Sequence, residues 1–203
     1  NNDWPGWSAH WADDGSLYMG SGVSEGGFGA EDIWQTHPPD STPALVDHRP
    51  VPAYDGPPTA WELLVAFPNE VIVHDVLALA AQTILAGTAP GGLVYRSTDG
   101  GSSWTAVTLG DSVIRVYDLA RAGGDTVYAG TYPEARVFRS FDGGATWTAC
   151  APISGAATAA RAVLPLSNGD LLVGLAPDQE PAPPATQGQG RLDRSRNRGA
   201  RWS

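Results

Sequence analysis

The sequence contains no lysine, so its 12 basic residues are all arginines, and 22 acidic residues bring the net charge to −10. An acidic chain is repelled by phosphate backbones and anionic headgroups, which argues against nucleic acid as a partner. The longest apolar stretch, Val76 to Ala81, is far shorter than the roughly 20 residues of a membrane-spanning helix, so we expect no membrane insertion. Cys150 is the only cysteine, which excludes an intrachain disulfide and a cysteine metal cluster.

Glycine and proline, in contrast, are plentiful. The 25 glycines and 17 prolines make up more than a fifth of the 203 residues, and 42% of the residues are hydrophobic. So many turn-forming residues exclude a helical bundle and favour short strands joined by turns, while the apolar fraction is sufficient for a buried core. We therefore expect an all-β protein.

Basic charge is concentrated at one end of the chain. Residues 191–203 contain five arginines and one aspartate. Such a run either binds anions or forms a solvated face, and the sequence alone favours the solvated face.

Three segments align with one another, at 92–107, 135–150 and 190–203. They share the pattern Ser-x-Asp-x-Gly-x-x-Trp, with Asn for Asp in the third copy. The pattern residues are Ser97, Asp99, Gly101, Trp104, Ser140, Asp142, Gly144, Trp147, Ser195, Asn197, Gly199 and Trp202. In a turn, the carboxylate can accept backbone N–H groups, the glycine can adopt positive φ and the tryptophan can pack between sheets, so we expect structural roles.

A second signature precedes these segments. Gly20, Gly87, Gly130 and Gly174 each close a short apolar run, at spacings of 67, 43 and 44 residues. A period in the low forties with about four short strands per period is typical of a β-propeller blade. We predict a single propeller domain of four antiparallel blades, at 7–66, 71–108, 113–150 and 160–203. The first blade is degenerate and carries a proline-rich insertion at 37–58.

The segments at 97–104 and 140–147 resemble the Asp-box, or BNR, repeat. That family includes sialidases, xyloglucanase-type glycoside hydrolases, sortilin-type receptor domains and a photosystem II assembly propeller. The resemblance implies that each box is a structural hairpin between the third and fourth strands of its blade. It also implies that ligands bind on the rim opposite the boxes.

On that opposite rim, acidic and aromatic residues recur. They include Glu25, Glu70, Asp111, Tyr132 and Glu134. Such side chains suit a sugar or a cationic group, and they equally suit plain solubility.

Two aspartates are the candidates for catalysis. The Arg-Ile-Pro signature of sialidases is missing, but other glycoside hydrolases need only two carboxylates roughly 5–9.5 Å apart. Asp75 and Asp118 occupy equivalent positions in the first strands of successive blades, which line the central channel of a propeller. The alternative is that they are repeat-equivalent polar residues hydrated in that channel.

Metal and cofactor sites are not expected. The insertion at 37–58 contains His37, Asp40, Asp47, His48 and Asp55, but their spacing matches no metal-ligand pattern. The chain also lacks a phosphate-binding glycine loop.

Together these features favour a non-catalytic propeller that serves as a binding or assembly scaffold for a protein partner or a glycan. The alternative is a glycoside hydrolase of the Asp-box type acting on a polysaccharide or glycan. The acidic composition and single cysteine fit an exported bacterial protein, extracellular or on the cell surface. Four blades are few for such a propeller, which predicts a fragment of a larger ring. The alternatives are a closed ring of four blades and edge pairing with further blades or another chain.

Overall fold

A computed structural model describes residues 63–80, 82–155, 157–177 and 190–203 with their side chains. It also gives the backbone of Glu62 and of β1 (Gly6–Trp11), β2 (Leu17–Ser21) and β3 (Asp32–Thr36). Glu25 and the insertion at 37–58 lie outside the described residues.

The described part of the chain consists of strands and connecting turns, which confirms the all-β prediction. It contains no helix long and apolar enough to cross a membrane. The remaining strands are β4 (Glu62–Ala66), β5 (Ile72–Ala80), β6 (Thr83–Ala89), β7 (Leu93–Ser97), β8 (Thr105–Thr108), β9 (Arg115–Gly123), β10 (Thr126–Tyr132), β11 (Val137–Ser140), β12 (Thr148–Ala149), β13 (Ala159–Pro165), β14 (Leu171–Ala176) and β15 (Arg191–Ser195).

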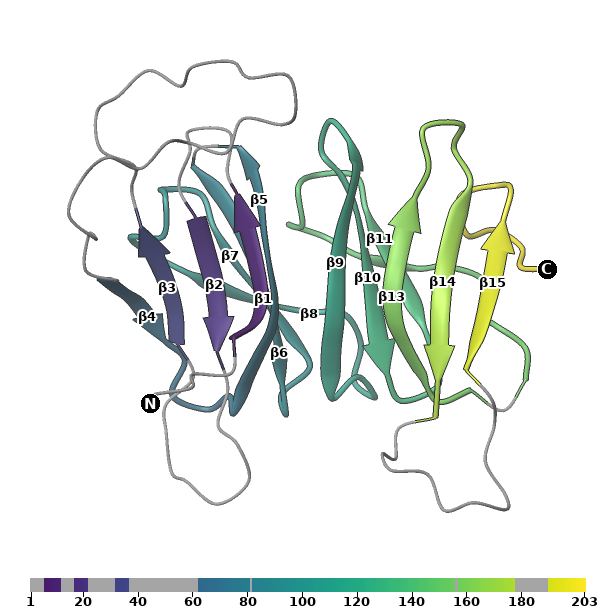
Figure 1. The fold of residues 1–203 in the computed structure, drawn as a ribbon, viewed down its shortest axis with the longest axis horizontal. Helices are drawn as coiled ribbons and strands as arrows, with labels where there is room; N and C mark the ends of the chain where they lie inside the picture. Colours follow the sequence, from purple (N-terminus) through teal and green to yellow (C-terminus); the bar gives the residue numbers. More distant parts are fainter. Residues whose placement is uncertain are drawn as a thin grey trace.

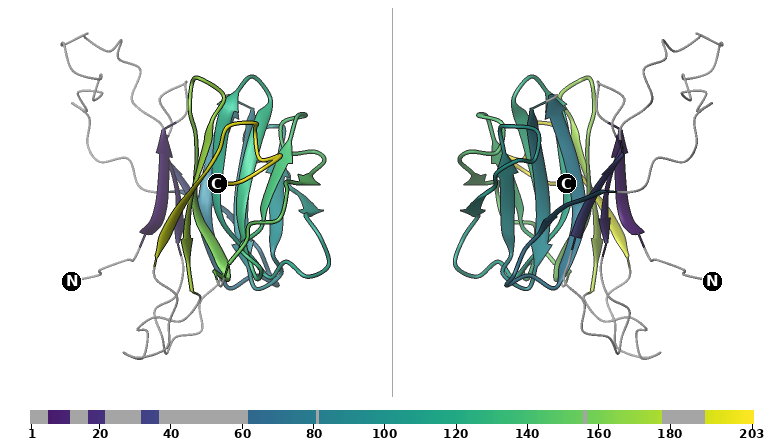
Figure 2. Two further views of the ribbon diagram at one scale, coloured as in Figure 1. Left: turned by 90° about the vertical axis from the view of Figure 1, so that its right-hand side faces the viewer. Right: turned by 90° about the vertical axis from the view of Figure 1, so that its left-hand side faces the viewer.

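These strands form four antiparallel sheets in simple sequential order: β1–β4, β5–β8, β9–β12 and β13–β15. The first strand of each sheet contacts the first strand of the next, so β1, β5, β9 and β13 form the inner side of the assembly. The sheets follow one another like blades around an axis (Figures 1 and 2). One rim carries the turns after the first and third strands, and the other carries the remaining loops.

The core consists of apolar layers between neighbouring sheets. In β6, Ile84 packs toward the first sheet while Leu85 packs toward the third. In the third sheet, Val127 faces the second sheet and Tyr128 faces the fourth, where it meets Val173. Both faces of the middle sheets are therefore buried, which explains why their second strands are almost continuously apolar.

The second-strand glycines allow neighbouring sheets to approach closely. A Cβ atom at Gly130 would lie 2.6 Å from the carbonyl oxygen of Ala160, in the first strand of the next sheet. At Gly87 a Cβ would lie 2.8 Å from Val116 Cγ1. At Gly174, in the last sheet, a Cβ would have Ala162 as its nearest neighbour, with Cβ at 3.4 Å and the backbone oxygen at 3.9 Å. The 43-residue glycine repeat is thus a packing requirement.

The three Ser-x-Asp/Asn segments form similar turns, here called the repeat turns (97–104, 140–147 and 195–202). In the first, Ser97 Oγ donates to Asp99 Oδ1 at 2.8 Å and accepts the Gly101 N–H at 2.8 Å. Asp99 Oδ1 also accepts the Ser103 N–H at 2.8 Å. The second turn repeats these bonds, and in the third the amide oxygen of Asn197 replaces the carboxylate.

The glycine repeat can be tested with a matched pair of substitutions. We expect G130A to destabilise the protein by about 1–3 kcal/mol, because its methyl group would overlap a backbone carbonyl that cannot move away. G174A introduces the same methyl group where the nearest atom is at ordinary contact distance, and it should change stability by less than about 1 kcal/mol. Urea denaturation measures both, and equal effects would contradict the packing role.

The repeat turns predict a specific acid sensitivity. Hydrogen bonds from Ser103 and Ser97 lower the pKa of Asp99 to about 2, and Thr146 and Ser140 do the same for Asp142. Because the pKa values are depressed in the folded state, their stabilisation is present above pH 4 and is lost as the pH falls toward 2. The D99N/D142N variant should show a flatter decline in unfolding free energy between pH 4 and pH 2 than the wild type.

Asn197 provides the reciprocal control for this acid sensitivity. It accepts the Arg201 N–H at 2.8 Å, in the same position as Asp99 and Asp142 in their turns. N197D should therefore steepen the acid-dependent loss of stability. An unchanged slope in both variants would show that other groups dominate acid unfolding.

Candidate functional site

The first strand of each sheet contains a β-bulge at the same place. The bulged residues are Trp7 in β1, His74 in β5, Tyr117 in β9 and Arg161 in β13. A bulge leaves one residue without a partner and redirects its side chain. In the three sheets whose side chains are described, the inner side of the assembly therefore presents large side chains at one level, namely His74, Tyr117 and Arg161.

The bulged side chains of three neighbouring sheets lie in a row. The ring centroids of His74 and Tyr117 are 4.8 Å apart, and Arg161 Cζ lies 4.7 Å from the Tyr117 centroid. Arg115 donates from Nη1 to the Tyr117 hydroxyl at 3.0 Å, and its Cζ lies 5.1 Å from the Tyr132 centroid. We call these five residues the inner cluster.

The inner cluster is cationic at neutral pH. Burial, followed by the charges of Arg115 and Arg161, lowers the pKa of His74 to about 4, so the imidazole is neutral at pH 7. His74 Nε2 and Arg161 Nε are buried and have no hydrogen-bond partner among the described residues. Guanidinium groups stacked on phenol rings combine a fixed positive charge with oriented donors, which suits an anionic group.

The two candidate catalytic aspartates lie beside this row, each directly after a bulged residue. Asp75 Oδ2 accepts the N–H of Leu119 in the next sheet at 2.7 Å, and Asp118 Oδ2 accepts the N–H of Val163 at 2.6 Å. Burial raises the pKa of Asp118. Each carboxylate therefore joins its sheet to the following one, which is a structural use of the repeat.

Two acidic residues predicted for the ligand rim are engaged within the protein. Glu70 is only 5% exposed, and its Oε2 accepts the Gly91 N–H at 3.0 Å. Glu134 is exposed and forms an ion pair with Arg136, with Nε and Oε2 3.1 Å apart. Both contribute to the loops of this rim.

The other rim residues differ in their surroundings. Tyr132 belongs to the inner cluster, Asp111 is exposed in the loop before β9, and Glu25 lies outside the described residues. Among the described side chains, no group of three or more His, Cys, Asp or Glu is placed to hold a metal ion. The histidines of the insertion, His37 and His48, lie outside this part of the chain.

Sequence reasoning missed His74, Arg115, Tyr117 and Arg161. A signal was present, because the residue before Asp75 and the residue before Asp118 are equivalent in the repeat. The bulge itself cannot be read from alternation, since it shifts the side-chain period by one residue. The repeat alignment therefore matched His74 with Tyr117, but it did not indicate that these side chains are in contact.

No family model and no curated protein matches the sequence. Solved structures of YCF48 do match. One, YCF48 bound to D1 peptide, is 17% identical with a TM-score of 0.51 over 68% of this chain and 41% of that chain. Another, YCF48 from Cyanidioschyzon merolae, is 15% identical with a TM-score of 0.56 over 88% of this chain and 52% of that chain.

These matches confirm the predicted fold class. The chain has the fold of a β-propeller and spans about half the length of the solved structures it matches. At these sequence identities the likeness concerns the fold alone.

The structural role of Asp118 can be tested with two substitutions, only one of which keeps a hydrogen-bond acceptor. D118A removes the acceptor and leaves the Val163 N–H without it, so we expect a loss of about 1–3 kcal/mol in unfolding free energy. D118N retains an acceptor oxygen and removes a charge that burial disfavours, so its stability should stay within about 1 kcal/mol of the wild type. Urea denaturation at pH 7 distinguishes the two.

Equal destabilisation by D118A and D118N would contradict this structural role. Polysaccharide hydrolysis by the wild type that disappears in D118N and in D75N would instead support the catalytic alternative.

Proposed function

We propose that this protein is a non-catalytic propeller of the Asp-box family and that it serves as a binding or assembly scaffold for a protein partner. The inner cluster is the observation that carries the proposal. It gathers Arg115, Arg161, His74 and two tyrosines where the first strands of three sheets meet. These residues are half-buried, so they combine defined positions with access to a ligand.

The repeat turns support the family assignment. Their Ser, Asp or Asn, and Gly residues make the same hydrogen bonds at three positions of the chain. All of these bonds remain within the turn, which supports a scaffold role for the pattern. Asp75 and Asp118 also serve the scaffold in this proposal, because each binds a backbone N–H of the next sheet.

The chemistry of the inner cluster favours a segment that carries a carboxylate and an apolar or aromatic neighbour. The arginines supply charge, and the rings of Tyr117 and Tyr132 supply flat contact surfaces. One matched propeller has been solved with a D1 peptide bound, which supports a peptide-like partner here. The acidic composition and single cysteine support a location outside the cell or on its surface.

The proposal predicts charge-dependent peptide binding at the inner cluster. We would measure fluorescence polarisation with short synthetic peptides that contain Asp or Glu beside an aromatic residue, each paired with its Asn or Gln counterpart. Acidic peptides should bind, and R161Q should weaken them about tenfold or more, as expected for loss of a charge-assisted hydrogen bond of about 1.4 kcal/mol.

R121Q is the matched control for this experiment. Arg121 is exposed at the other end of β9, where its Nε donates to the Gly124 carbonyl at 3.1 Å. The R121Q substitution removes one positive charge, as R161Q does, but at a site away from the inner cluster. It should therefore change the affinity for acidic peptides by less than about twofold. Equal affinities for acidic and amide peptides, or equal losses in R161Q and R121Q, would contradict the proposal.

A further inference from the structure

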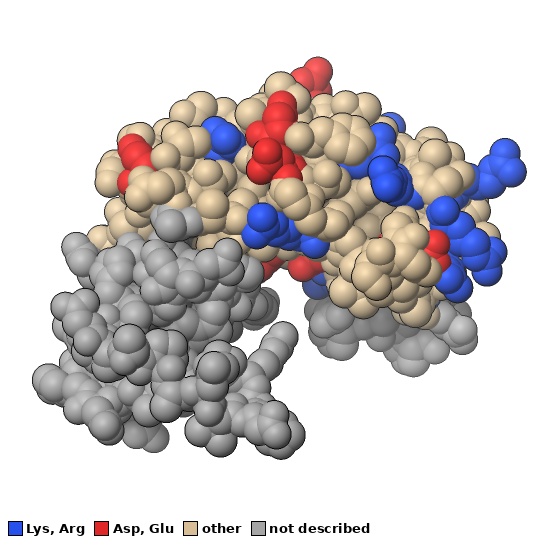
Figure 3. Space-filling view, turned by 90° about the horizontal axis from the view of Figure 1, so that it is seen from above, with Lys and Arg blue, Asp and Glu red and all other residues tan. Residues whose placement is uncertain are grey.

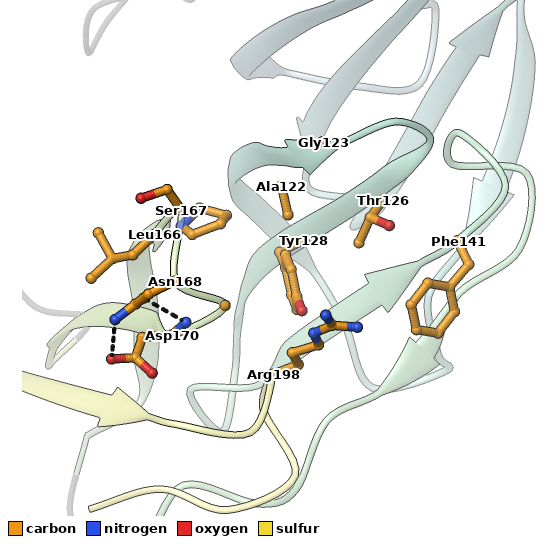
Figure 4. A pocket seen from close by; sticks show the side chains of 12 residues that line it. Ala122, Gly123, Thr126, Tyr128, Phe141, Leu166, Ser167, Asn168, Asp170 and Arg198 are labelled. Atoms are coloured by element: carbon orange, nitrogen blue, oxygen red, sulfur yellow. Dashed lines mark hydrogen bonds between the residues drawn. The ribbon is translucent and has the colours of Figure 1, made fainter.

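A pocket opens on the rim that carries the repeat turns, between the third and fourth sheets (Figure 4). Its volume is about 360 Å³, within the range of roughly 300–1,000 Å³ that is typical of small-molecule sites. The β9–β10 turn and the β13–β14 turn form two walls, and Phe141 and Arg198 of the second and third repeat turns complete it. This is the rim opposite to the inner cluster.

Arg198 is an exception to the repeat. The equivalent positions in the first two repeat turns are Gly100 and Gly143, with φ of 70° and 66°, and Arg198 adopts the same left-handed conformation with φ of 56°. The third turn thus places an arginine where glycine is favoured sterically. Departures of this kind concentrate at functional sites, and here the side chain lines the pocket.

The backbone role of this position does not require the arginine side chain. Gly143 accepts a hydrogen bond at its carbonyl from Arg96 Nε at 2.8 Å, and Arg198 accepts one at its carbonyl from Arg139 Nη1 at 3.0 Å. Gly143 therefore makes the same contact between sheets in the preceding repeat without a side chain. The Arg198 side chain needs another explanation.

Arg198 and Asp170 are the two charged residues of the pocket lining. No carboxylate of the described residues lies within ion-pair distance of Arg198. Asp170 also lines the pocket, but its Oδ2 accepts a hydrogen bond from Arg194 Nε at 2.9 Å, and this pairing lowers its pKa. Arginines gather at this end of the molecule, over β15 and the turn that follows it (Figure 3).

Aromatic and apolar groups complete the chemistry of the pocket. Phe141 is 58% exposed, and Arg139 Cζ lies 4.4 Å from the centroid of its ring. The Arg198 guanidinium extends between Phe141 and Tyr128 (Figure 4), and Pro165 and Leu166 also line the pocket. A flat apolar body can therefore lie against Phe141 while its charged group reaches Arg198.

We propose that this pocket binds a small aromatic carboxylate, with the carboxylate held by Arg198 and the ring packed on Phe141. A single planar guanidinium matches the two oxygens and the single charge of a carboxylate. The site is separate from the inner cluster and from any partner bound there.

The test is an NMR titration of the ¹⁵N-labelled protein with phenylacetate, following the amide signals of Gly123 and Gly169, which line the pocket. We expect a dissociation constant of ~1 mM, as for other ligands of about ten heavy atoms. Phenylacetamide has the same shape without the charge, and glucuronate has the charge without the aromatic ring. Both should bind about tenfold more weakly or not at all.

R198G is the decisive variant, because it restores the residue of the other two turns. It should raise the denaturation midpoint by removing a side chain from a left-handed position, yet abolish phenylacetate binding. F141A should weaken binding, and R196Q, which changes an exposed arginine of the same turn outside the pocket lining, should leave it within twofold.

Three results would overturn the proposal. They are the absence of amide shifts in the wild type, equal binding of phenylacetate and phenylacetamide, and full binding by R198G.

Discussion

The close approach of each sheet to the next is the constraint on which the rest of this structure depends. At Gly130 the carbonyl of Ala160 occupies the space that a Cβ would need, and Asp118 binds the N–H of Val163 in the same neighbouring strand. Steric fit and hydrogen bonding thus fix the inner strands together. A sheet that is hydrophobic on both faces can be stable only when neighbours cover it at this distance.

The same constraint creates the candidate site. The bulge in each first strand lies opposite the second-strand glycine, so the bulged residues of successive sheets fall at one level. Because the backbones are held close, His74, Tyr117 and Arg161 are near enough to contact in sequence. Positions that the repeat holds constant build the scaffold, while positions that it leaves variable carry different chemistry.

The fold could be predicted from the sequence because the Ser-x-Asp turns and the second-strand glycines recur at nearly the same interval. It predicted the site less well, because rim residues were chosen by type and loop position. Glu70 turned inward to bind the Gly91 N–H, and Glu134 paired with its neighbour Arg136. Bulges and the left-handed conformation of Arg198 depend on strand register and sheet packing, which alternation and composition do not specify.

The two candidate sites place arginines at defined positions of a protein whose net charge is −10. They lie at opposite ends of the strands, separated by about 20 Å at ~3.3 Å per residue along β9. That distance exceeds the Debye length of about 8 Å at physiological ionic strength, so neither site senses the other strongly. Each guanidinium is instead governed by its immediate surroundings, which include the ring of Tyr132 for Arg115, the ring of Tyr117 for Arg161 and the nearby Asp170 for Arg198. Carboxylates elsewhere on the surface are screened. Local packing, more than the overall charge, therefore sets the electrostatic surroundings of each candidate site.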